Sequence, residues 1–298
     1  MYVVLGASGN TGHVVAKNLL SQGKEVRVVG RNAEHLQGLA AEGAEIFVGD
    51  MTDGPALAKA FKGVESAYVM LPPNSTSNDF RAFQDRVSDA IAAAVENAGV
   101  KSVVSLSSIG ADKPSGTGPV VGLYNFEQKL NSIEGANILH LRAGYFMENT
   151  LPQAAVIRML GSLAGPVRPD LKLPMIATRD IGAAAAQALS SGFQGKRAQE
   201  LLGQRDIDYT EVAGTIGKAI GKPSLRYIQA PDNQLRGAMV QMGMSTNMVG
   251  LILDMAAALN AGYMKALEPR SAANTTPTSF ETFVEEGFVP AYQEQAAA

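Results

Sequence analysis

A glycine-rich turn near the amino terminus constrains the fold of this chain more than any other feature. The segment Gly6-Ala7-Ser8-Gly9-Asn10-Thr11-Gly12 follows a β-branched run, Tyr2-Val3-Val4-Leu5, and leads into a helical apolar pattern at residues 14–20. Three glycines at three-residue spacing between a strand and a helix are typical of a dinucleotide-binding turn, in which the helix N-terminus faces the phosphates. The alternative is an ordinary strand–turn–helix connection. The context on both sides of the glycines favours dinucleotide binding.

Strand and helix patterns alternate after this turn. Strand-like runs recur at residues 25–31, 45–50, 66–71, 102–108 and 137–142. Helical patterns lie between them, and the longest covers residues 79–98. The alternation predicts an α/β fold, a doubly wound parallel sheet of the Rossmann type. The apolar character of the strands agrees with helices on both faces of the sheet.

The residues at the end of the second predicted strand indicate which dinucleotide is bound. Dinucleotide folds often place a carboxylate there for a ribose 2′-hydroxyl, or a basic residue for a 2′-phosphate. This chain has Gly30-Arg31-Asn32 and no acid, so Arg31 favours NADP(H) over NAD(H). The alternative is a solvated arginine after a turn. Asp50 and Met51 follow the third strand, where they would border the adenine; the alternative for Asp50 is a capping role.

The second half of the chain is less regular. We expect a loop at residues 163–169, a helix beginning at Arg179 and one further strand at residues 199–203 that returns to the sheet. A mainly helical pattern follows Tyr209, interrupted by a short strand at residues 225–228. We therefore expect an NADP-binding Rossmann domain at residues 1–150, rejoined by about 176–205. The smaller substrate-binding region would comprise residues 151–175 and 206–298.

The composition excludes several classes of function. The chain of 298 residues is 46% hydrophobic and 18% charged, with a formal net charge of −3, which argues against nucleic-acid and membrane partners. It has no cysteine, so it has no disulfide, thiolate nucleophile or zinc–thiolate site. The three histidines do not have metal-ligand spacing, and we expect no metal. We see no secretory signal or clean membrane span, and we expect a cytoplasmic protein.

These motifs resemble the NmrA-like group of atypical short-chain dehydrogenases. The resemblance covers most of the chain and rests on the glycine turn, Arg31, Gly49-Asp50, Ser107-Ser108, residues 126–130 and residues 141–149. The group includes NADPH-dependent quinone reductases, reductases of azo and triphenylmethane dyes, and non-catalytic redox-sensing regulators. The resemblance implies a nicotinamide that lies across the carboxyl edge of the sheet.

The resemblance also implies positions around the cofactor. Leu71-Pro72-Pro73 would pass beside the ribose and pyrophosphate, and Gly144-Tyr145-Phe146 would line the nicotinamide and substrate pocket, with Asn149 nearby. Ser107 and Ser108, at the end of a predicted strand, would contact the ribose or nicotinamide. The alternatives are core packing for Tyr145 and Phe146, and bonding to backbone groups for the serines.

The chain departs from most short-chain dehydrogenases in one motif. Those enzymes carry Tyr-x-x-x-Lys, which places both side chains on one helix face for proton transfer. None of the eight tyrosines has a lysine four residues later; Tyr124 is followed by Gln128, and Lys129 is one position too far. The catalytic residues are therefore not assigned, and the candidates are Tyr145, Lys129 and Ser107.

The carboxy-terminal half offers material for an apolar pocket. Met239, Met242, Met244 and Met248 are clustered in sequence, as in an adaptable pocket wall, although methionines also fill helical cores. We place Met242 in the substrate pocket, with Tyr263 closing it.

The missing proton-relay pair bears on the reaction. A quinone or conjugated aromatic acceptor stabilises its own negative charge after hydride transfer, whereas a ketone reduced to an alkoxide needs a positioned acid. The sequence therefore favours an NADPH-dependent reductase of a quinone-like or conjugated aromatic acceptor. The alternatives are a non-catalytic NADP(H)-sensing regulator and a reductase or epimerase of a small carbonyl metabolite. A homodimer is compatible with each.

Overall fold

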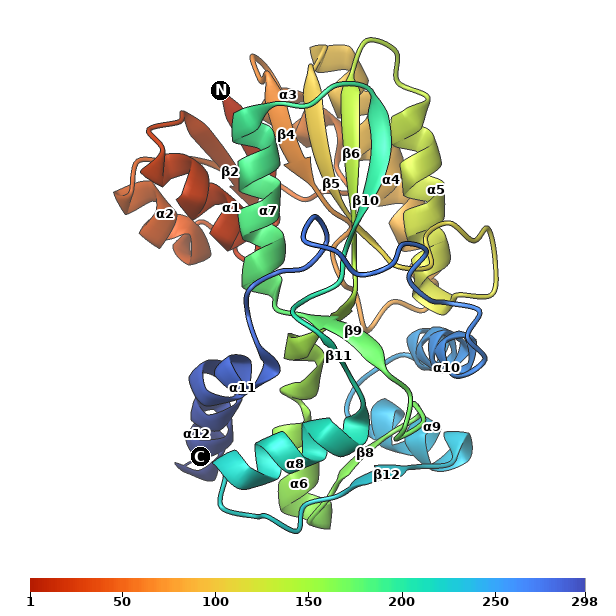
Figure 1. Ribbon diagram of the computed structural model, residues 1–298. Helices are drawn as coiled ribbons and strands as arrows, with labels where there is room; N and C mark the ends of the chain where they lie inside the picture. The colour runs from red at the N-terminus through yellow and green to blue at the C-terminus, as the bar shows by residue number, and fades with distance from the viewer. Residues whose placement is uncertain (298) are drawn as a thin grey trace.

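A computed structural model describes residues 1–297, and its central element is a seven-stranded sheet (Figure 1). The strands lie in the order β10-β6-β5-β4-β1-β2-β3, and every neighbouring pair is parallel. Their bounds are β1 Tyr2–Leu5, β2 Val26–Gly30, β3 Glu45–Val48, β4 Ser66–Val69, β5 Ser102–Ser108, β6 Asn137–Ala143 and β10 Lys196–Leu201. The chain builds outward from β1 in one direction and then, with β4, in the other. The predicted Rossmann-type α/β fold is confirmed, and the order reverses between β1 and β4, where such sheets form a ligand crevice.

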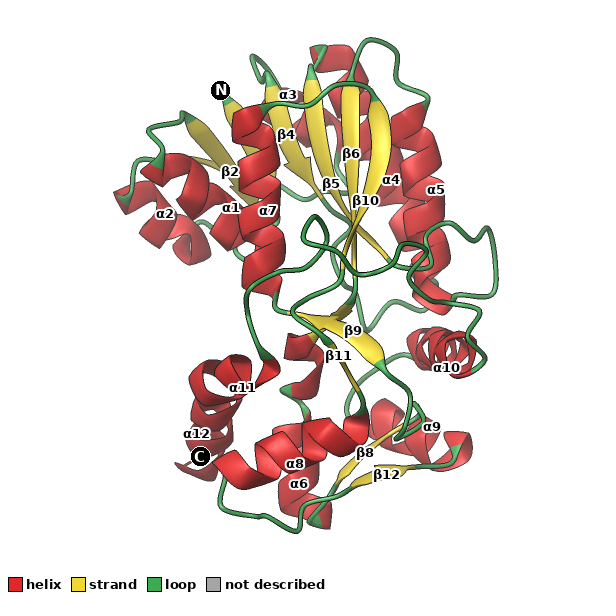
Figure 2. Ribbon diagram, in the orientation of Figure 1, coloured by secondary structure: helices red, strands yellow, loops and turns green. Residues whose placement is uncertain are grey.

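Helices cover both faces of this sheet (Figure 2). One face carries α1 Asn10–Ser21, α2 Gln37–Ala41 and α7 Thr178–Ser191, and the other carries α3 Gly54–Ala60, α4 Phe80–Ala98 and α5 Val121–Asn131. Side chains alternate across each strand, so Val4 of β1 packs in one core while its neighbours Val3 and Leu5 pack in the other. The buried strands thus have the apolar sequences that a two-sided sheet requires.

A glycine lets α1 and α7 cross closely. A Cβ atom at Gly182 of α7 would lie 2.8 Å from the Thr11 carbonyl oxygen and 2.6 Å from the Cβ of Val14. The close crossing fixes α1 against the sheet, and with it the glycine turn that precedes α1.

The remaining elements form a smaller region below the carboxyl edge of the sheet (Figure 1). Its strands form two small sheets, one of β7 Tyr145–Phe146, β9 Leu173–Ile176 and β11 Asp206–Ile207, and one of β8 Leu163–Gly165 and β12 Tyr227–Gln229. Its helices are α6 Gln153–Leu160, α8 Tyr209–Ala219, α9 Asp232–Gln241, α10 Thr246–Asn260, α11 Phe280–Phe283 and α12 Val289–Ala297. Short 3₁₀ segments occur at Glu34–Leu36, Gly118–Val120 and Met147–Thr150, and a π-helical segment at Val284–Phe288.

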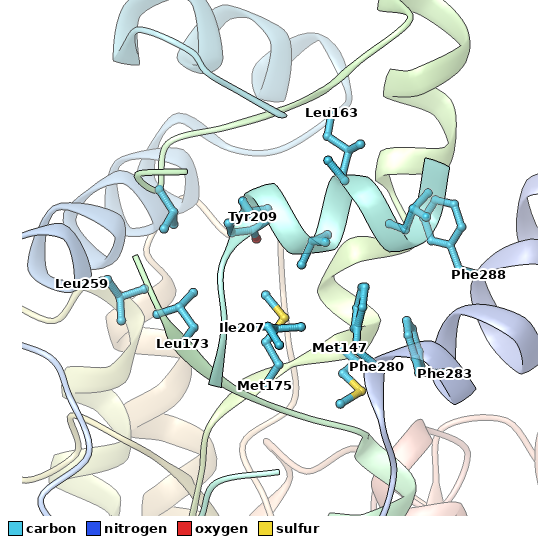
Figure 3. Close-up of a cluster of buried hydrophobic side chains, with 14 of the residues drawn as sticks. Met147, Leu163, Leu173, Met175, Ile207, Tyr209, Leu259, Phe280, Phe283 and Phe288 are labelled. Carbon is cyan, nitrogen blue, oxygen red and sulfur yellow. The ribbon is translucent and has the colours of Figure 1, made fainter. Parts of the chain in front are cut away.

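A separate apolar core holds this region together (Figure 3). Met175 from β9, Ile207 from β11 and Phe280 from α11 meet there, and all three are at most 2% exposed. Segments that are more than 100 residues apart in the chain therefore share one core. This shared core fixes the position of the loops of the smaller region that face the main sheet.

Two expectations for this half differ in outcome. The returning strand exists as β10, and it pairs with β6 in parallel. The loop expected at residues 163–169 is wrong in part, because Leu163–Gly165 form strand β8 and pair with β12. Leu163 is fully buried, but its partner strand lies more than 60 residues downstream. The glycine and prolines of residues 163–169 indicate a loop, and the local sequence does not show this distant pairing. Across residues 1–297, no helix combines the length and apolarity needed to cross a bilayer.

Candidate functional site

A cavity of about 860 Å³ lies at the carboxyl edge of the sheet, where the strand order reverses. Its upper wall consists of residues at or just beyond the strand ends: Gly6 after β1, Leu71 after β4, Ser107 on β5 and Ala143 on β6. The lower region contributes mainly apolar side chains, among them Leu173, Met255, Leu259 and Met264. The cavity therefore has the location of a ligand crevice in a doubly wound fold and the apolar lining of a small-molecule site.

The glycine turn has the backbone that close approach to a ligand requires. Gly6 adopts a left-handed conformation with φ of +66°, and its carbonyl accepts a 2.9 Å hydrogen bond from the amide of Gly9. A Cβ atom at Gly12 would lie 2.4 Å from the Gly6 carbonyl oxygen, so only glycine lets α1 start this close to β1. Gly9 is the N-cap of α1 and has no side chain above the first turn.

The first turn of α1 is the part of the molecule suited to phosphates. Gly9, Asn10 and Thr11 line the cavity, and amides in a first helical turn have no partner within the helix. The side chain of Thr11 is fixed from behind, because its hydroxyl accepts a 2.9 Å hydrogen bond from the buried Tyr68. The residues present therefore fit a pyrophosphate group.

Three residues of the turn do not line the cavity. Ala7 is fully buried in the core, Gly12 is buried against the Gly6 carbonyl, and Ser8 lines a second hollow of about 440 Å³ together with Gly9 and Asn10. The turn therefore meets the cavity through four of its seven residues, Gly6, Gly9, Asn10 and Thr11.

Arg31, Asp50 and Met51 lie beyond the ends of β2 and β3, outside the cavity lining. Asp50 accepts hydrogen bonds from the amide and the hydroxyl of Thr52, both at 2.7 Å. These bonds hold the pKa of Asp50 below its usual value, and the nearby charge of Arg31 acts in the same direction. Asp50 thus closes a local turn, while Asp53 caps α3. Met51 packs partly into the core, and Arg31 is exposed beside Asp50.

Ser107 lines the cavity, but its hydroxyl proton is already donated in a hydrogen bond to another side chain. It donates a 2.5 Å hydrogen bond to Oε1 of Glu127. Arg142 donates to the same Oε1 at 3.0 Å and to Oε2 at 2.6 Å. Glu127 is 2% exposed, and both of its oxygens accept hydrogen bonds from Arg142, so in this bidentate pair Glu127 acts as an acceptor. Ser107 therefore presents lone pairs to the cavity and can accept, but not donate, a hydrogen bond there. Ser108 also lines the cavity, and its hydroxyl bonds to the Ile109 carbonyl.

Lys129 does not line the cavity, and its contacts give no support to a catalytic role. Its ammonium group lies 2.5 Å from Asp89 and 2.9 Å from the Ser88 hydroxyl, both on α4. The α5 residue that lines the cavity is Leu123, while Tyr124 lies one position round the helix and is outside the lining. The face of α5 toward the cavity therefore carries an apolar side chain and no proton-relay pair.

Most of the residues predicted for the nicotinamide and substrate pocket line the cavity. Leu71, Pro72 and Pro73 line the cavity, as do Gly144, Tyr145, Phe146 and Asn149. Gly144 is needed at this point because a Cβ atom there would lie 2.1 Å from the Pro174 carbonyl oxygen.

Met242 and Tyr263 do not line the cavity, so the structure does not support the expectation for either residue. Met242 is 58% exposed at the end of α9. Tyr263 is 43% exposed, and its ring packs on Gly116 beneath the ammonium of Lys113. The apolar wall instead comes from residues not predicted, including Met70, Leu106, Leu123, Met255, Leu259 and Met264. Of these residues, only Met70 and Leu106 had a position in the sequence that could have predicted a place in the cavity wall, since both lie near the end of a predicted strand.

Comparisons with known proteins agree with this geometry. The sequence model of the NmrA-like family matches residues 2–285. An NAD(P)H azoreductase of Xenophilus azovorans is 29% identical over 266 residues, which are 89% of each chain. Quinone oxidoreductase 2 of Escherichia coli strain K12 is 28% identical over 85% of this chain and 86% of its own. The crystal structure of an Escherichia coli NADPH-dependent quinone oxidoreductase complexed with NADPH superimposes with a TM-score of 0.80 at 24% identity, covering 95% of this chain and 98% of the other.

Proposed function

Because the chain belongs to the NmrA-like family, we propose that it is an oxidoreductase that uses NADPH to reduce quinone-like or conjugated aromatic acceptors. The azoreductase and the quinone oxidoreductase that it resembles are named for this chemistry, and both align with more than four fifths of the chain. The cavity at the sheet edge is the site of the reaction.

NADPH supplies a hydride when it is bound; the protein supplies position and surroundings. The amides of the first turn of α1 would hold the pyrophosphate, and Arg31 would pair with the 2′-phosphate. Ser107, whose proton is donated to Glu127, would accept a hydrogen bond from a ribose hydroxyl or from the carboxamide. We assign cofactor binding to residues 1–150 with about 176–205, and substrate binding to the remaining region.

The observation that carries the choice of acceptor is the face of α5. Leu123 stands at the cavity, and Lys129 is bound to carboxylates of α4 instead. An alkoxide formed from a ketone would have no acid beside it on this helix. A quinone or dye disperses its charge over a conjugated system and takes its proton from water. The apolar walls suit such flat aromatic molecules.

A screen of NADPH oxidation tests the proposal. Purified protein is mixed with NADPH and, in turn, with quinones, azo dyes and aldehydes, while NADPH binding is followed by fluorescence. The proposal expects turnover of quinones or dyes. Tight NADPH binding without any turnover would favour a sensing role, and turnover of aldehydes alone would favour a carbonyl reductase.

A further inference from the structure

Three tyrosines form a stack that ends at the cavity. Tyr209, at the start of α8, stacks on Tyr227 of β12 with ring centroids 4.3 Å apart and 23° between the planes. Tyr145 of β7 meets Tyr209 edge to face, at 6.5 Å and 78°. Tyr145 lines the cavity and the other two do not. The stack therefore holds the phenol of Tyr145 in a defined orientation at the cavity wall.

The hydroxyl groups of the stack have a definite direction. The hydroxyl of Tyr227 donates to the Val167 carbonyl at 2.8 Å, and that of Tyr209 donates to the oxygen of Tyr145 at 3.3 Å. Tyr209 is only 6% exposed, so its proton needs an acceptor inside the protein, and Tyr145 provides one. Among residues 1–294, whose side chains the structure describes, no atom accepts a hydrogen bond from Tyr145. Tyr145 is the member of the stack that lines the cavity, and its proton has no acceptor among these residues.

We propose that Tyr145 is a catalytic residue that donates a hydrogen bond to the carbonyl oxygen of a quinone-type acceptor, and that Tyr209 is the residue that positions it. This inference rests on the proposed function and adds the group that recognises the acceptor. Ser107 cannot take this role because its proton is held by Glu127. Burial raises the pKa of Tyr145, so the phenol remains a donor at neutral pH.

The chemistry of quinone reduction explains why a donor is useful there. A quinone gains two electrons and one proton as a hydride, and one of its oxygens becomes a phenolate, which then takes a second proton from water. A hydrogen bond to that oxygen is stronger in the transition state than in the ground state, so it accelerates the step. Tyr145 stabilises the charge without losing its own proton.

A cationic triphenylmethane dye provides the matched comparison. Hydride adds to its central carbon, the positive charge is neutralised, and a neutral leuco dye forms. No oxygen gains negative charge and no further proton is needed. When such a dye is reduced, a hydrogen bond from Tyr145 therefore has no developing negative charge to stabilise.

The test compares Tyr145→Phe with the wild type on a simple quinone and on a cationic triphenylmethane dye. We expect kcat/KM for the quinone to fall about tenfold or more, mainly through kcat, as when one donor to a developing oxyanion is removed. The value for the dye and the Kd for NADPH should stay within about twofold. Tyr209→Phe removes only the hydroxyl behind Tyr145, and should lower the quinone value by a smaller factor.

The outcomes separate this inference from the proposed function. Tyr124→Phe, on α5 outside the cavity lining, is the matched control and should change neither acceptor. An equal loss for both acceptors, or no loss for the quinone, overturns the role of Tyr145 while the reductase function stands. A wild type that reduces neither acceptor overturns the proposed function itself. Should Tyr145→Phe fail to fold, Tyr209→Phe provides the test. A loss of kcat/KM for the quinone alone supports the role of Tyr145, and an equal loss for both acceptors or no loss overturns it.

Discussion

Arg31→Ala offers the sharpest test of cofactor choice. Arg31 follows β2, is exposed, and lies close enough to Asp50 to influence its carboxylate. On NADPH binding we expect its guanidinium to pair with the 2′-phosphate, which NADH lacks. The substitution should therefore weaken NADPH and leave NADH unchanged.

The size of the effect follows from the exposure of Arg31. A hydrogen bond between charged groups contributes about 1.5–3 kcal/mol. Because water and salt screen an exposed pair, we expect the lower end, about 1.5 kcal/mol, or roughly a tenfold rise in the Kd for NADPH. The difference between wild type and variant should also shrink as salt is added.

The assay is a fluorescence titration of each protein with NADPH and with NADH. Arg86→Ala removes the same charge from an exposed position on α4, far along the chain from β2, and serves as the control. Equal weakening of both cofactors, or no weakening of NADPH, would refute the assignment of Arg31 to the 2′-phosphate.

Three further predictions concern single positions. Gly12→Ala places a Cβ atom 2.4 Å from the Gly6 carbonyl oxygen, so NADPH affinity should fall at least about tenfold and the Tm should drop. Gly214→Ala, with open space around it in α8, is the control and should change neither quantity. Unchanged NADPH affinity in Gly12→Ala would contradict the role of the turn. Lys129→Ala should keep quinone turnover within about twofold, because its ammonium pairs with Asp89; a tenfold loss of kcat would restore Lys129 as a catalytic residue. Burial lowers the pKa of His140 to about 4, so the unfolded chain binds more protons below pH 6.5 and stability should fall as the pH drops from 6.5 to 4, by at most about 3 kcal/mol. Denaturant unfolding at pH 7 and 4.5 measures this loss; His140→Gln should reduce it, and an identical loss in the variant would exclude His140 as its source.

Local patterns were sufficient for the parts of the fold that local chemistry decides. The turn at Gly6 needs a positive φ, and the start of α1 needs a residue without a Cβ atom at position 12. Glycine meets both requirements, so the glycine spacing was enough to predict this turn. The strands of the main sheet are short apolar runs with helices between them. Parallel pairing of such units leads to the observed order and brings the strand ends to one edge.

The side-chain positions that the sequence did not predict depend on contacts made at long range. Lys129 was a reasonable candidate on its helix, but the carboxylates that hold it belong to α4, some 40 residues earlier. Met242 lies in a methionine-rich stretch, yet the orientation of α9 leaves it in solvent. The bond from Ser107 to Glu127 joins residues of β5 and α5, and it reverses the hydrogen-bonding role of the serine. Periodicity within one segment contains no information on these orientations.

The most direct test of the central claim is the ratio of two kcat/KM values, one for a simple quinone and one for an aliphatic aldehyde, measured with the same preparation and saturating NADPH. Tyr145 can donate a hydrogen bond to the acceptor oxygen, but burial raises its pKa and it has no lysine four residues later to lower it, while Leu123 occupies the cavity face of α5. Because an aldehyde needs a stronger acid than a quinone does, the site should reduce the quinone at least about a hundredfold more efficiently. Comparable efficiencies, or a preference for the aldehyde, would contradict the account.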